Sequence, residues 1–115
     1  MNNLIKSNNL IILKNILKID KNNFNLFYNN KVIKFINNES YFIYLTFINE
    51  NRQNIKINCL LNNKKIITLK LKSVNNGFCV IHKILNIHKN DILTFKNISK
   101  TILDITNFKI NIIKL

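Results

Sequence analysis

The sequence contains one glycine, no proline, no tryptophan and one arginine, Arg52, among its 115 residues. A single glycine excludes a glycine-rich phosphate-binding loop and the Gly-x-Ser-x-Gly turn of serine hydrolases, because each of these motifs needs at least two glycines. Several large classes of nucleotide-binding and hydrolytic enzyme are therefore excluded.

Acidic residues are also scarce: there are five, namely Asp20, Glu39, Glu50, Asp91 and Asp104. Catalysis by paired carboxylates requires two of them to be brought together. All but Asp104 adjoin predicted turns, where a carboxylate is usually solvated, and Asp104 is expected to point outward from a short strand. We therefore expect no catalytic residues and a protein that is not an enzyme.

The cysteines and histidines do not have the spacing of metal ligands. His82 and His88 lie on either side of a predicted strand end, with no third kind of ligand nearby. Cys79 and His82 are three residues apart and point to opposite faces of a strand, which disfavours a nucleophile and base pair. We expect no metal and no cofactor. Cys59 and Cys79 are interpreted as small buried hydrophobic residues, and a disulfide between them stays open.

No stretch approaches the roughly 18 uncharged apolar residues that a membrane-spanning helix needs. The N-terminal segment 1–19 is apolar in places, but Lys14 and Lys18 interrupt it and no small-residue cleavage site follows. We expect neither a membrane span nor a cleaved signal peptide.

The abundant residues are Asn, Ile and Lys, whose codons are A/T-rich, so the expected source is a genome of very low GC content. The formal net charge is +13, which by itself favours a nucleic acid or another anionic partner. However, all but one of the 18 basic residues are Lys, whereas readers of phosphate and bases prefer the bidentate fork of Arg. A small basic nucleic-acid-associated or ribosomal-type β protein, located in the cytoplasm, is therefore kept as the alternative function.

Short apolar runs separated by Asn-rich turns follow one another from Leu10 onward, which is typical of a β-sandwich or barrel. Apolar and polar residues alternate with period two, most clearly over 41–47 and 55–61. The turn residue Asn tolerates positive φ better than other non-glycine residues. The pattern predicts antiparallel strands at residues 10–19, 24–28, 31–36, 40–49, 53–61, 65–72, 78–85, 91–97, 101–106 and 108–115.

The length fits one domain, which we place at residues 10–115 after a loose N-terminal arm at residues 1–9. The in-phase positions of the strongest runs are expected to be buried: Tyr41, Ile43, Leu45, Ile57, Leu93 and Ile112. The strand at 40–49 also carries Phe42 and Tyr44 on its other face. Aromatic side chains on both faces indicate that both faces are covered, and the second cover can be another subunit.

Four short blocks occur in a recognisable order. They resemble segments of the C-terminal globular domain of bacterial collagen-like surface proteins, such as the exosporium glycoproteins of spore-formers. Those domains belong to the superfamily of tumour necrosis factor and the globular head of complement first-component q. The blocks are Phe35-Ile-Asn-Asn-Glu-Ser-Tyr41-Phe-Ile43, Cys59-Leu-Leu-Asn62-Asn63-Lys-Lys-Ile66, Ile87-His-Lys-Asn90-Asp91-Ile-Leu93-Thr-Phe95-Lys-Asn97 and Phe108-Lys-Ile-Asn-Ile-Ile-Lys-Leu115.

The sequence departs from the family at three glycines, which are replaced by Glu39, Asn63 and Asn90. The two asparagines are the substitutes best able to keep a left-handed turn, and Glu39 is the poorest fit. The collagen-like Gly-X-Y stalk that usually precedes the domain is absent from this sequence. The sequence therefore does not match the family's role in filaments or in the exosporium.

The resemblance implies an all-β jelly-roll sandwich of about ten antiparallel strands that forms a homotrimer around an apolar axis. It also implies a non-enzymatic binding or structural module of a bacterial cell or spore surface, presenting loops to a protein or glycan ligand. The candidate trimer-interface residues come from the central and terminal strands, which carry more apolar surface than one face can hide: Tyr41, Phe42, Tyr44, Phe108, Ile110 and Ile112.

Overall fold

A computed structural model describes residues 3–48, 54–71 and 78–115 of the chain, which form ten strands and no helix. The described part therefore has no helix that could cross a membrane. The segment 73–77 between the predicted strands 65–72 and 78–85 lies outside the described residues, as does Glu50. The strands are β1 (Leu4–Ile5), β2 (Phe24–Phe27), β3 (Val32–Phe35), β4 (Glu39–Ile48), β5 (Ile55–Leu61), β6 (Lys64–Leu71), β7 (Phe78–Ile87), β8 (Ile92–Asn97), β9 (Leu103–Asp104) and β10 (Phe108–Lys114).

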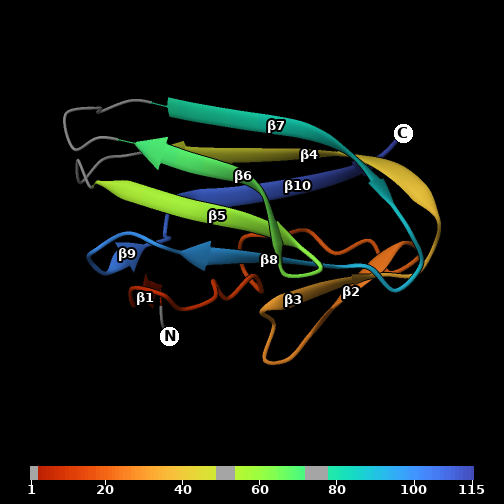
Figure 1. Cartoon of the computed structure of the whole chain (residues 1–115), viewed down its shortest axis with the longest axis horizontal. Helices are drawn as coiled ribbons and strands as arrows, with labels where there is room; N and C mark the ends of the chain where they lie inside the picture. Colours follow the sequence, from red (N-terminus) through yellow and green to blue (C-terminus); the bar gives the residue numbers. More distant parts are fainter. Residues whose placement is uncertain (1–2, 49–53, 72–77) are drawn as a thin grey trace.

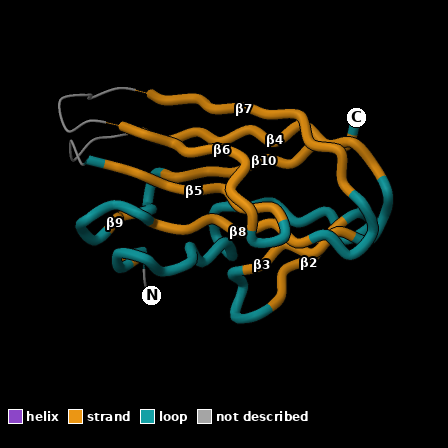
Figure 2. Tube along the Cα trace, viewed as in Figure 1, coloured by secondary structure: helices purple, strands orange, loops and turns teal. Residues whose placement is uncertain are grey.

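Two main sheets and one small sheet make up the fold (Figure 1). The five-stranded sheet has the order β2-β3-β8-β5-β6, the three-stranded sheet has the order β10-β4-β7, and β1 pairs with β9. Every paired strand runs antiparallel to its neighbour. Strands that are distant in sequence become neighbours, as in a jelly roll. Figure 2 shows loops, for example between β3 and β4 and between β7 and β8, where the described chain crosses from one main sheet to the other. The prediction of an all-β jelly roll is confirmed.

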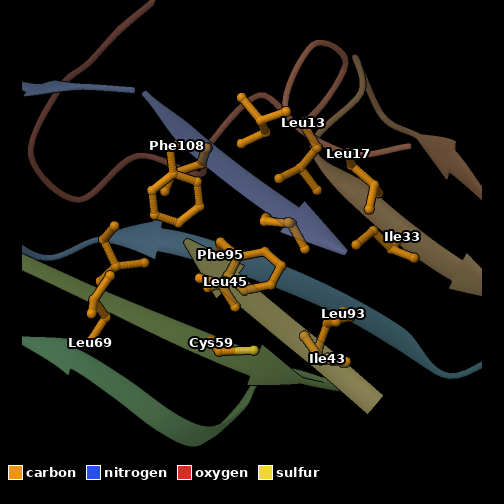
Figure 3. Close-up of a cluster of buried hydrophobic side chains, with 14 of the residues drawn as sticks. Leu13, Leu17, Ile33, Ile43, Leu45, Cys59, Leu69, Leu93, Phe95 and Phe108 are labelled. Carbon is orange, nitrogen blue, oxygen red and sulfur yellow. The ribbon is translucent and has the colours of Figure 1, made fainter. Parts of the chain in front are cut away.

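The core lies between the two main sheets, because each contributes the apolar half of its alternating strands. Side chains from β4 in one sheet and from β5 and β8 in the other meet there, as Figure 3 shows for Ile43, Cys59 and Phe95. Five of the six positions predicted to be buried are buried, and Ile112 is half-buried against the same core. The period-two alternation therefore gave the correct phase for each of these strands.

Residues 10–19 do not form the predicted strand. Leu10 bridges Lys96 of β8, whereas Leu17 bridges Ile110 of β10, which belongs to the other sheet. Between them, the carbonyl of Leu13 accepts hydrogen bonds from the backbone N–H of Ile16 and Leu17 at 3.2 and 3.1 Å, which forms a turn. The segment passes from one sheet to the other, and a single straight strand cannot do this. Its buried apolar side chains instead close one side of the core.

The sequence suggested a loose arm at residues 1–9, whereas the structure ties residues 3–9 to the sandwich. Asn97, whose side chain is fully buried, donates a hydrogen bond from Nδ2 to the carbonyl of Ile5 at 2.9 Å. Asn8 N–H donates to the carbonyl of Asn97 at 2.7 Å, and Ile5 is buried in the core. A buried polar group without a partner costs about 1–3 kcal/mol. These N-terminal residues supply an acceptor for the Asn97 side chain and a donor for its carbonyl.

Asparagine occupies most of the left-handed positions in the described part of the chain, and Tyr28 is the exception. Asn63 has φ 67° in the β5–β6 turn, and Asn90 has φ 73° before β8. These are two of the positions at which the resembling family has glycine, so the expectation that asparagine keeps the turn is confirmed. Glu39, the third such position, begins β4 in extended conformation, and its carboxylate pairs with Lys114 at 3.3 Å.

Candidate functional site

The outward side of the three-stranded sheet carries exposed apolar side chains. Phe42 on β4 lies between Ile84 of β7 and Ile113 of β10, its register partners on the two sides. Ile84 is 61% exposed and Ile113 is 54% exposed. The ring of Phe42 stacks on Tyr44 at 6.2 Å and on His82 at 5.6 Å between centroids. We call this surface the outer apolar face. It comprises Phe42, Tyr44, Ile48, His82, Ile84 and Ile113.

Polar residues surround the outer apolar face. Ser40 donates a hydrogen bond from its hydroxyl to Oδ1 of Asn86 at 2.7 Å at one end of the sheet. Lys109 and Asn111 of β10 are exposed, and Lys109 lies opposite Thr46. An apolar centre with a polar rim is the usual anatomy of a protein interface.

The structure separates the six candidate trimer-interface residues. Phe42 and Tyr44 lie on the outer apolar face. Tyr41, Phe108 and Ile110 are each 1% exposed and pack between the two sheets, and Ile112 is half-buried against that core. A contact on this sheet therefore uses the opposite face from most of the predicted residues.

Ile84, Ile113 and His82 were missed by the sequence reasoning. Their place beside Phe42 and Tyr44 depends on β7 and β10 both pairing with β4, and both strands are far from β4 in sequence. The sequence did contain one signal: Ile84 and Ile113 are apolar residues at positions of β7 and β10 that the alternation predicts to be exposed.

A second apolar surface lies at the open side of the sandwich, between the edge strands β6 and β7. A shallow hollow there is lined by half-buried Ile66 and Ile67 together with Cys59 and Lys83. Burial raises the pKa of the Cys59 thiol to about 12, and the nearby charge of Lys83 only partly offsets this. The thiol is neutral at physiological pH, so it lacks the thiolate character of a catalytic cysteine.

Cys59 is a free cysteine, and the side chain of Cys79 lies outside the described residues. Over the described part of the chain, no three His, Cys, Asp or Glu side chains gather as a metal site would require. His88 lies on the surface with Nδ1 3.8 Å from Oδ2 of Asp91, and His82 belongs to the outer apolar face.

No protein-family profile and no curated protein matches the sequence. Among solved structures, the chain is similar to rabbit GITRL, a tumour necrosis factor-family ligand, with a TM-score of 0.60 and 20% identity over 80% of this chain and 76% of that one. The fold is a tumour necrosis factor-like jelly roll.

Two further structures agree with this fold. Pika GITRL has a TM-score of 0.59 and 18% identity, with coverage of 80% of this chain and 82% of that one. A family 35 carbohydrate-binding module from an environmental isolate has a TM-score of 0.52 and 14% identity, with coverage of 95% of this chain and 90% of that one. At these identities the likeness concerns the fold alone.

Proposed function

We propose that this chain is a non-enzymatic binding module that assembles as a homotrimer through the outer apolar face. The observation that carries the proposal is the row formed by Ile113, Phe42 and Ile84, in which two aliphatic side chains are more than half exposed on either side of an aromatic ring. Soluble monomers rarely expose a contiguous apolar patch of this kind.

A three-fold ring explains both apolar surfaces. Copies related by a closed three-fold rotation contact one another through two different patches, head to tail. The outer apolar face is one such patch, and the open side with Ile66 and Ile67 is the other. The resemblance to a trimeric superfamily supports the same arrangement.

Charge does not oppose this assembly strongly. Three copies bring together a formal charge of +39, or 3 × 13. The row at the centre of the outer apolar face contains no lysine, and Lys109 and Lys114 lie outside that row. Lys83 lines the hollow of the second patch, where in a head-to-tail contact it meets this uncharged row and not another lysine. Exposed charges farther apart than a Debye length of about 8 Å are largely screened at physiological salt.

The ligand class proposed for the module is a protein or a glycan. The structural neighbours, a tumour necrosis factor-family ligand and a carbohydrate-binding module, are consistent with a binding role. The location on a bacterial cell or spore surface rests on the sequence resemblance and stays a prediction, which antibody labelling of intact cells and spores would test.

Light scattering at physiological salt tests the assembly. The chain has a mass of 13.6 kDa, so a trimer has a mass of about 41 kDa (3 × 13.6 kDa). We expect Ile113→Lys to give a folded monomer, because it places a charge in the centre of the contact. Ile102→Lys is the matched control: Ile102 is 52% exposed, like Ile113, but lies in the loop before β9.

A monomeric wild-type protein at micromolar concentration would refute the trimer. Loss of assembly in both variants would show that added charge, and not this face, controls association. A cooperative unfolding transition in each variant establishes that it is folded.

A further inference from the structure

A groove of about 490 Å³ lies at the end of the five-stranded sheet where β6 and β8 finish. In Figure 1 this is the left-hand end of the molecule, where the arrowheads of both strands point. Its walls are Lys56 of β5, Lys70 of β6 and the loop that follows β8. The outer apolar face belongs to the other sheet, so the groove is a separate feature.

Three exposed lysines line this groove. Lys56 and Lys70 are direct cross-strand partners, and Lys100 extends from the loop. Like charges placed directly opposite one another destabilise a sheet unless a counter-charge lies between them. Of the described residues that line the groove, none is Asp or Glu. Among the described lining residues the three lysines therefore have no counter-charge, and this arrangement favours an external anion.

The loop that carries Lys100 is held in place. The hydroxyl of Ser99 accepts a hydrogen bond from Lys56 N–H at 2.7 Å and donates to the Lys56 carbonyl at 3.3 Å. The Ile98 N–H donates to the same carbonyl at 2.8 Å. Buried Asn97 accepts from Ser99 N–H at 2.9 Å and donates to the Thr101 carbonyl at 3.2 Å.

These bonds fix the backbone on both sides of Lys100 relative to Lys56. A site whose backbone is already ordered loses less conformational entropy when a ligand binds. The groove is thus a preformed cationic site rather than three independent surface lysines.

We propose that this groove binds an oxyanion group, a sulfate or a carboxylate, carried by an acidic polysaccharide. The proposal rests on the proposed binding function and names a ligand class for it. Lysine attracts oxyanions as a point charge and does not require a bidentate geometry. Sequence-tolerant binding of single-stranded nucleic acid uses aromatic side chains that stack on bases, and the described residues lining the groove include no aromatic side chain. The groove therefore suits a polysaccharide better than a nucleic acid.

Calorimetric titration with four probes tests the proposal: heparin as a sulfated polysaccharide, polygalacturonate as a carboxylated one, neutral dextran and single-stranded polythymidylate. The groove variant carries Lys56→Gln, Lys70→Gln and Lys100→Gln. The matched control carries Lys14→Gln, Lys21→Gln and Lys89→Gln, which remove the same charge from exposed lysines that do not line the groove.

We expect the wild type and the control variant to bind one or both acidic polysaccharides at physiological salt and not to bind dextran. The groove variant should bind about tenfold more weakly, as expected when three exposed ion pairs are lost together. Equal losses in the two variants would overturn the proposal, because binding would then follow net charge alone. Tighter binding of polythymidylate than of either polysaccharide would also overturn it and would support a nucleic-acid function.

The same titration with Ile113→Lys separates this proposal from the trimer. If that monomeric variant binds with unchanged affinity per copy, the groove acts within one chain. If the wild type is itself monomeric but the groove variant still loses affinity, the trimer fails and the anion site stands.

Discussion

The Tyr41 hydroxyl is a polar group buried in the apolar core. Its side chain is 1% exposed, and the oxygen has no hydrogen-bond partner in the described part of the chain. Burial, and then the negative charges of Glu39 and Asp20, raise the pKa of the phenol. The ring itself packs well, with its centroid 4.9 Å from that of Phe35. The ring therefore stabilises the fold, whereas the hydroxyl costs free energy.

Replacing Tyr41 with Phe should increase the free energy of unfolding by about 1 kcal/mol, because the packed ring stays and the unpaired hydroxyl is removed. Urea denaturation followed by circular dichroism measures the change. Tyr44→Phe is the control, since Tyr44 lies on the outward side of the same strand and should change the free energy little. A clear loss of stability in Tyr41→Phe would show that the hydroxyl has a partner.

At the scale of the elements, two turns are joined by the side chains of Asn62 and Asp91. Asn62 donates from Nδ2 to Oδ1 of Asp91 at 2.9 Å and accepts at Oδ1 from Ile92 N–H at 2.9 Å. The other oxygen of Asp91 accepts from His88 N–H at 2.8 Å. The β5–β6 turn is thereby fastened to the turn that precedes β8.

The pKa of the Asp91 carboxyl reflects these contacts. Burial alone raises it, but the hydrogen bonds from Asn62 and from the His88 backbone, with the charge of His88, outweigh burial and lower the pKa below its ordinary 3.8. The folded protein therefore holds this proton less tightly than the unfolded chain does. The stabilisation is complete above the unfolded pKa and is lost as the pH falls through the folded pKa.

The Asp91→Asn variant should lose about 1–2 kcal/mol of unfolding free energy at neutral pH, since a charge-assisted acceptor is replaced by a neutral amide. The difference from wild type should begin to shrink as the pH falls below about 4, where the unfolded chain takes up the proton, and should be lost below the lowered pKa of the folded state, where the wild-type carboxyl is neutral. Denaturation profiles of both proteins across this range measure the effect. Parallel profiles would contradict the assigned role of the carboxylate.

Local patterns predicted some elements and could not predict others. The alternation in β4 places Tyr41 and Ile43 in the core, and Asn63 marks its turn, because both signals depend on neighbouring residues. The path of residues 10–19 depends on which sheet each half meets, and the outer apolar face depends on the pairing of distant strands. Neither property is encoded in a short window of sequence.

At the scale of the whole molecule, the jelly roll has two chemically different outer regions. One is apolar and lies on the three-stranded sheet, around Phe42 and Ile113; the other is cationic and lies at the end of the five-stranded sheet, around Lys56 and Lys70. Assembly through the first leaves the second available for a ligand in each copy.

Assembly should also make the melting temperature depend on protein concentration. If folding and association are coupled, the Tm of the wild type should rise with protein concentration by mass action. The Tm of Ile113→Lys should be independent of concentration, because that variant does not associate. Differential scanning calorimetry over a wide concentration range compares the two, and a concentration-independent wild-type Tm would argue against the coupling.

The buried thiol of Cys59 has a consequence for the reactivity of the folded protein. Cys59 is a free cysteine in the core between the two main sheets. At its pKa of about 12, this thiol is almost entirely protonated near neutral pH and is shielded from oxidants. We therefore expect the Cys59 thiol of the folded protein to resist alkylating reagents and to react only when the core opens.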